Sequence, residues 1–392
     1  MLEAWLMELL KAVGRLFLNP LLYWTIILVT VVGYRRVKRD RVKFGAKVFD
    51  VFAEWKDTWI LSITLGLFIS ILTIGIGFLF TYETILLLSV ITILLSFTLR
   101  FSMLSASYTI GLTYILLLLI PLLLENQKFI NVALFSSVSL TALTILLGLF
   151  LMVEAQLLSK TKRNETFPDL SLDQRGGWVG IHHVKKLSII PFFTLIPHGL
   201  IESFAPYWPY FTIGEETYSL VLVPFVIGFH HVVKGGLPDQ ATIKIAKSVF
   251  FLALIVTAIA VGSIFVSWLS IAAVVIAILG REIINYRHRI NDQRNRPFFH
   301  QTNDGLKVLS IIPGSPADRL QILVGETITK VNGKRITTEQ QFYEALQETG
   351  AFFKLDLIDD FGEVRFVQSA IYEGDHHELG LIFTSKPHRL HK

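Results

Sequence analysis

Residues 248–280 read SVFFLALIVTAIAVGSIFVSWLSIAAVVIAILG and contain no charged side chain. A single helix of this length would measure about 50 Å at 1.5 Å per residue, whereas the hydrocarbon core of a bilayer is about 30 Å thick. Gly262 lies near the middle of the run, so we expect two short membrane spans that meet close to it. The run therefore predicts a membrane protein whose last two spans form a hairpin.

The composition of the whole chain is typical of an integral membrane protein. Of its 392 residues, 52% are hydrophobic and only 17% are charged, which is too apolar for an ordinary soluble globule. The chain has no cysteine, and this excludes disulfides, thiolate catalysis and cysteine-ligated metal centres. The first apolar run has no small-residue cleavage site and is followed by a dense basic stretch, so we expect a retained anchor.

Seven further apolar runs precede this hairpin, and each is counted as a membrane-spanning helix. They are Leu16–Tyr34, Thr58–Phe80, Thr84–Leu99, Phe101–Leu124, Phe129–Val153, Leu187–Leu200 and Thr217–Val233. We therefore expect a polytopic α-helical transmembrane domain of about eight or nine helices over residues 16–280. Residues 1–15 are moderately amphipathic and either lie on the membrane surface or form a simple extension.

Lysine and arginine concentrate in alternate loops between these runs. The loop Arg35–Lys56 contains eight of them and Glu154–Lys186 contains six, whereas Ile201–Glu216 contains none. Because short cytoplasmic loops collect Lys and Arg, the two basic loops are expected inside the cell. If residues 248–280 form a hairpin, a basic linker at 281–302 and the domain after it are also cytoplasmic; a single span would put them outside. The loops account for the net charge of +5, and no nucleic-acid binding is expected.

The residues after the linker alternate charged and apolar side chains like a soluble domain, which we place at 303–385 with a tail at 386–392. Strand periodicity, turn residues and a helix cap predict its elements. They are a strand Gly305–Ile312, a turn and short helix from Pro313, a strand before the Asn332-Gly333 turn, a helix Glu339–Glu348 capped by Thr338, and strands Phe353–Ile358 and Glu363–Ser369.

The sequences PGSPA at 313–317 and GETITKVNG at 325–333 resemble those of the bacterial PDZ domain found in HtrA-type proteases and signalling proteins. The resemblance covers about Gly305–Phe383. It implies an α+β fold of the circularly permuted bacterial type, in which the strand after the carboxylate-binding loop comes last. Glu326 stands where the family usually has aspartate, and the usual Ala-Gly-Leu is replaced around Leu320–Leu323, so this corner is expected to differ in shape.

The segment ELGLIF at 378–383 is similar to the carboxylate-binding loop of that family and the strand that follows it. Backbone N–H groups around Gly380 are expected to hold a terminal carboxylate, and an extended peptide would add as a strand beside Leu381–Phe383. The predicted peptide-binding residues are Leu379, Gly380, Leu381, Ile382, Phe383, Phe342 and Leu346. The alternative is a closing core strand that binds no ligand.

Histidine pairs are the other candidate site residues. His182-His183 and His230-His231 are expected at cytoplasmic helix boundaries, where adjacent side chains diverge by about 100° and chelate poorly, so packing or headgroup contact is favoured over metal binding. His198 and Glu202 would share a helix face as a satisfied intramembrane pair. The sequence has no His-Glu-x-x-His or Gly-x-Ser-x-Gly motif and no paired intramembrane aspartates. No catalytic residue, metal or cofactor is therefore predicted.

The many-span half, the single PDZ-like domain and the stretches NPLLYW at 19–24 and GYRRVKR at 33–39 together resemble the MinJ family of cell-division topological determinants of Gram-positive rods. The resemblance implies a multi-pass cell-membrane adaptor that is not an enzyme. It further implies enrichment at septa and poles, and a link from a DivIVA-like scaffold to MinD and divisome membrane proteins. The residues alone indicate only a membrane-anchored adaptor. The alternatives are an intramembrane protease, a PDZ-containing regulator of one, and a transporter using His198 and Glu202.

Overall fold

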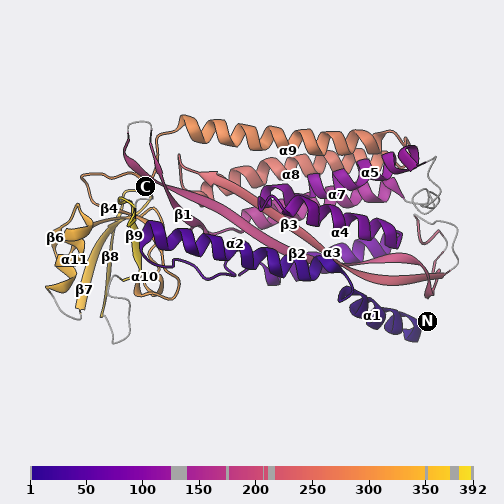
Figure 1. Cartoon of the computed structure of the whole chain (residues 1–392), viewed down its shortest axis with the longest axis horizontal. Helices are drawn as coiled ribbons and strands as arrows, with labels where there is room; N and C mark the ends of the chain where they lie inside the picture. Colours follow the sequence, from indigo (N-terminus) through magenta and orange to yellow (C-terminus); the bar gives the residue numbers. More distant parts are fainter. Residues whose placement is uncertain are drawn as a thin grey trace.

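The computed structural model describes residues 2–124, 139–173, 176–205, 207–210, 217–348, 352–370 and 379–389. A bundle of helices packs around a long antiparallel β-hairpin, and a small mixed domain lies at one end of the bundle (Figure 1). We call the end of the bundle that carries this C-terminal domain the near end. The N-terminus lies at the opposite, far end (Figure 1).

The bundle consists of helices packed around the hairpin (Figure 1). They are α1 (Leu2–Leu16), α2 (Pro20–Phe44), α3 (Trp59–Ile76), α4 (Tyr82–Ser96), α5 (Ala106–Leu124), α7 (Leu140–Ser159), α8 (Pro238–Gly262) and α9 (Leu269–Arg294), with 3-10 turns η1 (Phe101–Leu104) and η2 (Arg163–Glu165). Among the described residues, α3, α7, α8 and α9 are each long and apolar enough to cross a membrane. Helices α1 and α2, bent by 43° at their break, pass the same test together.

The expected spans agree with these helices over much of the bundle. The apolar run 248–280 is divided between α8, which ends at Gly262, and α9, which begins at Leu269, so the predicted hairpin is confirmed. The first half of the expected span Phe129–Val153 lies outside the described residues, and the rest belongs to α7. Helix α1 exposes Leu2, Leu6 and Leu10, as an amphipathic surface segment would.

Two segments that were expected to be membrane helices, Leu187–Leu200 and Thr217–Val233, are strands instead, so this part of the prediction is wrong. They form β2 (Trp178–Glu202) and β3 (Thr217–Val233), which pair antiparallel, and β1 (Phe167–Leu172) pairs with the beginning of β2. At about 3.3 Å per residue, the 17 residues of β3 measure about 56 Å. The hairpin therefore runs along the bundle beside the helices (Figure 1).

Proline and β-branched residues explain why these segments are strands. Pro191 and Pro224 lie directly opposite each other in the hairpin, and each would cost about 3 kcal/mol inside a helix because it lacks an N–H and clashes with the preceding turn. The remaining residues are mostly Val, Ile, Phe and Thr, which pack well on a pleated surface. The count of eight or nine membrane helices is therefore too high by these two segments.

The edge of β2 is closed by polar groups of α3. The Phe193 N–H donates to Ser70 Oγ at 2.9 Å, and the Thr73 hydroxyl donates to the Phe193 carbonyl at 2.6 Å. Gly66 allows this approach, because a Cβ at that position would lie 2.1 Å from the Pro191 carbonyl oxygen. Side chains of one helix thus replace the strand that is missing from the edge of the sheet.

The segment after α3 continues this closure toward the far end. The Leu195 N–H donates to the Phe78 carbonyl at 3.2 Å, and the Phe80 N–H donates to the Leu195 carbonyl at 3.0 Å. On β3, Arg15 of α1 donates to the Leu220 carbonyl at 2.6 Å. Non-helical backbone is tolerated at membrane depth only where the protein itself satisfies it, and these contacts meet that condition.

Helix α9 extends into the segment that was expected to be a basic linker at 281–302, so the linker is shorter than predicted. Arg281 is fully buried, and its Nη2 lies 2.6 Å from Oε1 of Glu154 in α7, which is also fully buried. The Ser105 hydroxyl donates to the other Glu154 oxygen at 2.6 Å. Arg281 is therefore a structural ion-pair partner within the bundle, not a loop residue.

The C-terminal domain has the elements predicted for it. They are β4 (Leu306–Ile311), α10 (Pro316–Arg319), β5 (Thr327–Val331), β6 (Lys334–Arg335), α11 (Glu339–Gln347), β7 (Phe352–Ile358), β8 (Val364–Ala370) and β9 (Leu381–Phe383). The sheet order is β8-β7-β5-β4-β9, with β6 beside β5. Thr338 caps α11 in a capping box with Gln341, which confirms the predicted cap.

The domain is attached to the near end of the bundle by paired backbone and side-chain bonds. Asn164, in η2, donates from Nδ2 to the Ile322 carbonyl and accepts from the Val324 N–H, both at 3.0 Å. The Gly180 N–H of β2 donates to the Phe299 carbonyl at 2.8 Å. An apolar cluster lies beneath these bonds and includes Leu170, Leu237, Phe299, Leu309 and Val324. The two halves of the chain therefore share a packed interface.

We predict that Gly66→Ala destabilises the chain. The added methyl group would meet the Pro191 carbonyl oxygen, and the shift that it forces should lower the free energy of unfolding by about 1–3 kcal/mol. Thermal unfolding of the purified chain in detergent micelles measures the effect. Gly75→Ala in the same helix is the matched control, because nothing lies within 4 Å of its Cβ position. Equal unfolding midpoints for the two variants would contradict the close helix–strand approach.

We also predict that Glu154→Leu lowers the stability of the chain much more than removal of both members of the ion pair does. The single change leaves the buried Arg281 charge unpaired, which should cost about 3–5 kcal/mol, whereas the double change Glu154→Leu with Arg281→Met removes both charges. The double variant should recover most of the lost unfolding midpoint. If the double variant is no more stable than the single one, the unpaired Arg281 charge is not the cause of the lost stability.

Candidate functional site

Strand β9 contains three of the predicted peptide-binding residues and lies at the edge of the sheet. Leu381, Ile382 and Phe383 pair with Ile311, Ser310 and Val308 of β4. In the sheet order of the described strands, β9 is terminal, so one side of it is not paired with another strand. An edge strand of this kind can accept an extended segment as an additional strand.

The loop before β9 has two consecutive residues in the left-handed region, Leu379 at φ +53° and Gly380 at φ +75°. Their carbonyl groups accept hydrogen bonds from the Ala317 and Ile312 N–H groups at 3.0 and 2.8 Å. A Cβ on Gly380 would lie 2.2 Å from the Cβ of Ser315. Glycine is therefore required here, because the loop packs directly on the turn that begins α10.

A cavity of about 360 Å³ lies between β9, α11 and the end of α2. From the C-terminal domain its wall includes Leu381, Ile382 and Phe383 of β9 and Glu339 and Tyr343 of α11. Lys43, Phe44 and Ala46 supply a wall from the membrane half, and Ser385, Lys386 and His388 supply another from the tail. The cavity is therefore composite, and its membrane-side and tail residues were not anticipated from the sequence.

Phe342 and Leu346, the predicted pocket residues of α11, do not line this cavity. Both are buried in the core of the domain, where the Phe342 ring lies 5.2 Å from that of Phe383. One position further along the helix, Tyr343 is half-buried and reaches the cavity. The apolar face of α11 was recognised from its periodicity, but Tyr343, at the edge of that face, meets the cavity together with Glu339. The peptide-binding role of all seven residues stays a prediction.

The tail after β9 packs on the end of α2. The His388 and Arg389 N–H groups donate to the Lys43 and Val42 carbonyls at 2.9 and 3.0 Å. The last carbonyls of a helix have no partner within the helix, so the tail satisfies two groups that α2 leaves open. This contact draws the tail across one side of the composite cavity.

The histidine pairs lie on strands and not on helices, so the expected helical geometry is wrong for them. His183 Nδ1 lies 3.0 Å from His230 Nε2, and His183 Nε2 lies 3.1 Å from Asp169 Oδ2. Burial raises the pKa of Asp169, but the His183 hydrogen bond and the charges of Arg39 and Lys43 outweigh it and hold that pKa below its ordinary value. Within the described ranges, no group of three or more His, Asp or Glu side chains is placed to hold a metal ion.

His198 and Glu202 also lie in β2, so they do not share a helix face as expected. His198 has a left-handed backbone, φ +61°, next to an irregularity in the β2–β3 pairing after Pro197. Glu202 is exposed at the end of the strand, opposite Thr217. The expected helical pair of His198 and Glu202 is therefore wrong, because the segment is a strand.

Comparison with known proteins agrees with both halves of this architecture. The PDZ domain family model matches residues 307–355. The cell division topological determinant MinJ of Bacillus subtilis is 34% identical over 379 residues, which cover 97% of this chain and 96% of that protein. A probable MinJ of Lacticaseibacillus paracasei is 28% identical over 80 residues, or 20% of this chain and 22% of its own. Since the first relationship extends over nearly the whole of both chains, this chain belongs to the MinJ family of cell division topological determinants.

Proposed function

We propose that the chain is a membrane-anchored adaptor whose PDZ domain takes up an extended segment of a cell-division protein. The unpaired edge of β9 beside the composite cavity is the observation that carries the proposal. Main-chain bonds to β9 would supply affinity, and the cavity between Tyr343 and Phe44 would select a side chain. The proposed partners are a DivIVA-like scaffold, MinD and divisome membrane proteins, which this chain would link to place the division septum.

The proposed orientation puts the PDZ domain in the cytoplasm. The basic ends of α2 and α9 both lie at the near end of the bundle, beside this domain (Figure 1). Short cytoplasmic segments are enriched in Lys and Arg, because these residues resist translocation through the bilayer. Cytoplasmic partners would then reach the groove directly, and the protein would concentrate with them at septa and poles.

We predict that a fluorescent reporter that matures only in the cytoplasm is active when it is fused after Lys392. The same reporter fused before Met1 should be inactive, because α1 lies at the far end of the bundle (Figure 1). An exported phosphatase at the same two positions should give the opposite pattern. Phosphatase activity from the C-terminal fusion would overturn the orientation and the cytoplasmic partners with it.

We further predict that Tyr343→Ala weakens partner capture without unfolding the domain. The change removes a ring from the cavity wall, and the loss of one interface aromatic typically weakens binding by about tenfold or more. Partner binding is measured by photo-crosslinking from position 382 in cells, together with the septal fraction of a fluorescent fusion.

Gln347→Ala is the matched control for this test, because Gln347 is exposed near the end of the same helix and is not part of the cavity wall. It should leave crosslinking and septal localisation unchanged. If Tyr343→Ala behaves like the control in both measurements, the groove is not the site of capture and β9 is only a closing strand.

A further inference from the structure

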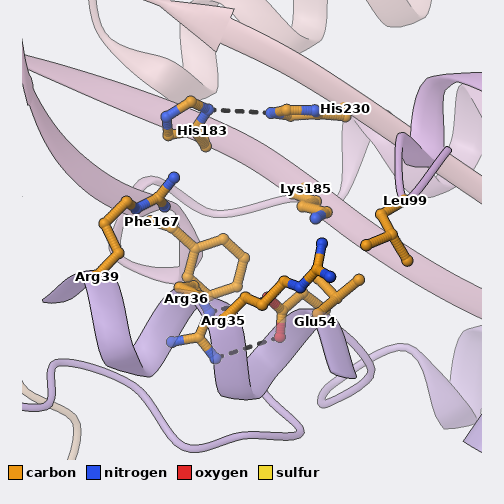
Figure 2. A pocket seen from close by; sticks show the side chains of 10 residues that line it. Arg35, Arg36, Arg39, Glu54, Leu99, Phe167, His183, Lys185 and His230 are labelled. Atoms are coloured by element: carbon orange, nitrogen blue, oxygen red, sulfur yellow. Dashed lines mark hydrogen bonds and ion pairs between the residues drawn. The ribbon is translucent and has the colours of Figure 1, made fainter. Parts of the chain in front are cut away.

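A second cavity, of about 300 Å³, lies at the near end of the bundle, between α2 and the β-hairpin. Its wall contains Arg35, Arg36 and Arg39 of α2, Lys185 of β2, and one carboxylate, Glu54. The imidazoles of His183 and His230 complete the opposite side (Figure 2). Three arginines and one lysine therefore surround one small space together with a single carboxylate.

The one carboxylate in the cavity is already bound by Arg36. Glu54 accepts from Arg36 Nε at 2.8 Å and from Nη2 at 3.2 Å, and both side chains are buried. The Arg36 guanidinium also lies 4.5 Å from the centre of the Phe167 ring and donates to the Asp50 carbonyl at 2.6 Å. This arginine holds the loop before α3 in place, and its charge is matched locally.

The other cations are not matched in this way. Arg39 lies 3.4 Å from Asp169, but that carboxylate also pairs with Lys43 and His183. In the part of the chain that the structure describes, no carboxylate lies within ion-pair distance of Arg35 or Lys185. Figure 2 shows these two side chains reaching into the same space from α2 and β2. Because no described carboxylate offsets their charges, these side chains make the cavity a region of positive potential.

Lys185 has an environment that ordinary surface lysines lack. It is half-buried in β2, and its Nζ lies 4.3 Å from the centre of the Phe101 ring, a contact that positions the ammonium group. Placing a partly desolvated cation opposite an arginine is unfavourable unless an anion lies between them. The arrangement therefore favours an anion between Lys185 and Arg35.

The cavity lies where the protein changes from apolar to charged. On α2, Ile27 and Val31 are exposed at intervals of four residues before Arg35, so the three side chains follow one face of the helix. Trp59 begins α3 and Trp55 lies in the turn before it, with their rings 4.6 Å apart; aromatic residues are enriched in this way at the membrane interface. An acyl chain along Ile27 and Val31 would bring its headgroup to Arg35.

We propose that this cavity binds the phosphate group of an anionic lipid headgroup, with Arg35, Arg39 and Lys185 as its ligands. Guanidinium groups match phosphate oxygens with two parallel donors, and an ammonium group adds a point charge. Basic pockets between membrane segments on the cytoplasmic side are suited to such headgroups. A free phosphate ester has the same anionic group, so the lipid and soluble sources are separated by experiment. The proposal does not depend on the peptide groove.

The test uses the full chain purified in a neutral detergent. Phosphatidylglycerol, phosphatidylcholine and soluble glycerol phosphate are titrated separately, and the thermal unfolding midpoint is recorded with native mass spectrometry of bound lipid. Phosphatidylglycerol should raise the midpoint saturably, and phosphatidylcholine should have little effect. In the double variant Arg35→Gln with Lys185→Gln, the apparent affinity for phosphatidylglycerol should fall by about tenfold or more.

Lys38→Gln with Arg41→Gln is the matched control, because both residues are exposed on α2, carry the same total charge and do not line the cavity. This control should retain the lipid response. The exchange Arg35→Lys with Lys185→Arg keeps both charges and should restore most of the binding, which separates a lost ligand from a folding defect. The midpoint of each variant without lipid provides the folding reference.

The outcomes distinguish a lipid site, a site for any phosphate group and an effect of general surface charge. If glycerol phosphate raises the midpoint as much as phosphatidylglycerol, and the double variant abolishes both effects, the cavity is a phosphate site and the lipid source is overturned. If the double variant and the charge-matched control lose the lipid response equally, the effect is general surface charge and the proposal fails. It also fails if no phosphate compound raises the midpoint of the unaltered chain.

Discussion

Backbone hydrogen bonding inside an apolar bundle is the constraint on which this structure depends. A two-stranded hairpin within a membrane domain leaves polar edges that neither lipid nor apolar side chains can satisfy. Here Ser70 and Thr73 bond directly to β2, and the backbone after α3 continues the pairing at Leu195. Gly66 makes this possible by removing a side chain from the contact. Helices α1 and α3 are therefore parts of the sheet's hydrogen-bond network as well as its neighbours.

The near end of the bundle joins the membrane half and the C-terminal domain into one packed unit. Arg36 secures the loop before α3, Asn164 bonds to the PDZ domain, and the tail returns to the last turn of α2. Since Phe44 forms part of the composite cavity, this cavity includes residues from both halves. A partner segment in that groove would contact the membrane anchor as well as the PDZ domain. Recognition and anchoring are then physically linked through α2, which also carries Arg35 and Arg39.

The sequence predicted the features that local patterns control. The break at Gly262, the Thr338 cap and the order of PDZ elements follow from length, capping chemistry and turn residues, and each is confirmed. The strands β2 and β3 were missed because an apolar run has no period that separates a buried strand from a membrane helix. Pro191, Pro197 and Pro224 were the available signal. The composite cavity and the Glu154–Arg281 pair join residues far apart in the chain, and no local pattern predicts such contacts.

Replacing two helices by two strands leaves the alternation of loops intact, since a strand of this length also carries the chain from one end of the bundle to the other.

The order of elements along the chain has a consequence for biogenesis. A helix can enter the bilayer alone because its hydrogen bonds are internal, but β2 and β3 cannot. The groups that close their edges belong to α1, α3 and the segment 78–80, all of which are synthesised earlier. When the ribosome reaches residue 178, the segments that supply the acceptors and donors for the hairpin have already been synthesised. The nascent strands can therefore assemble onto an existing surface, and α8 and α9 follow to complete the bundle.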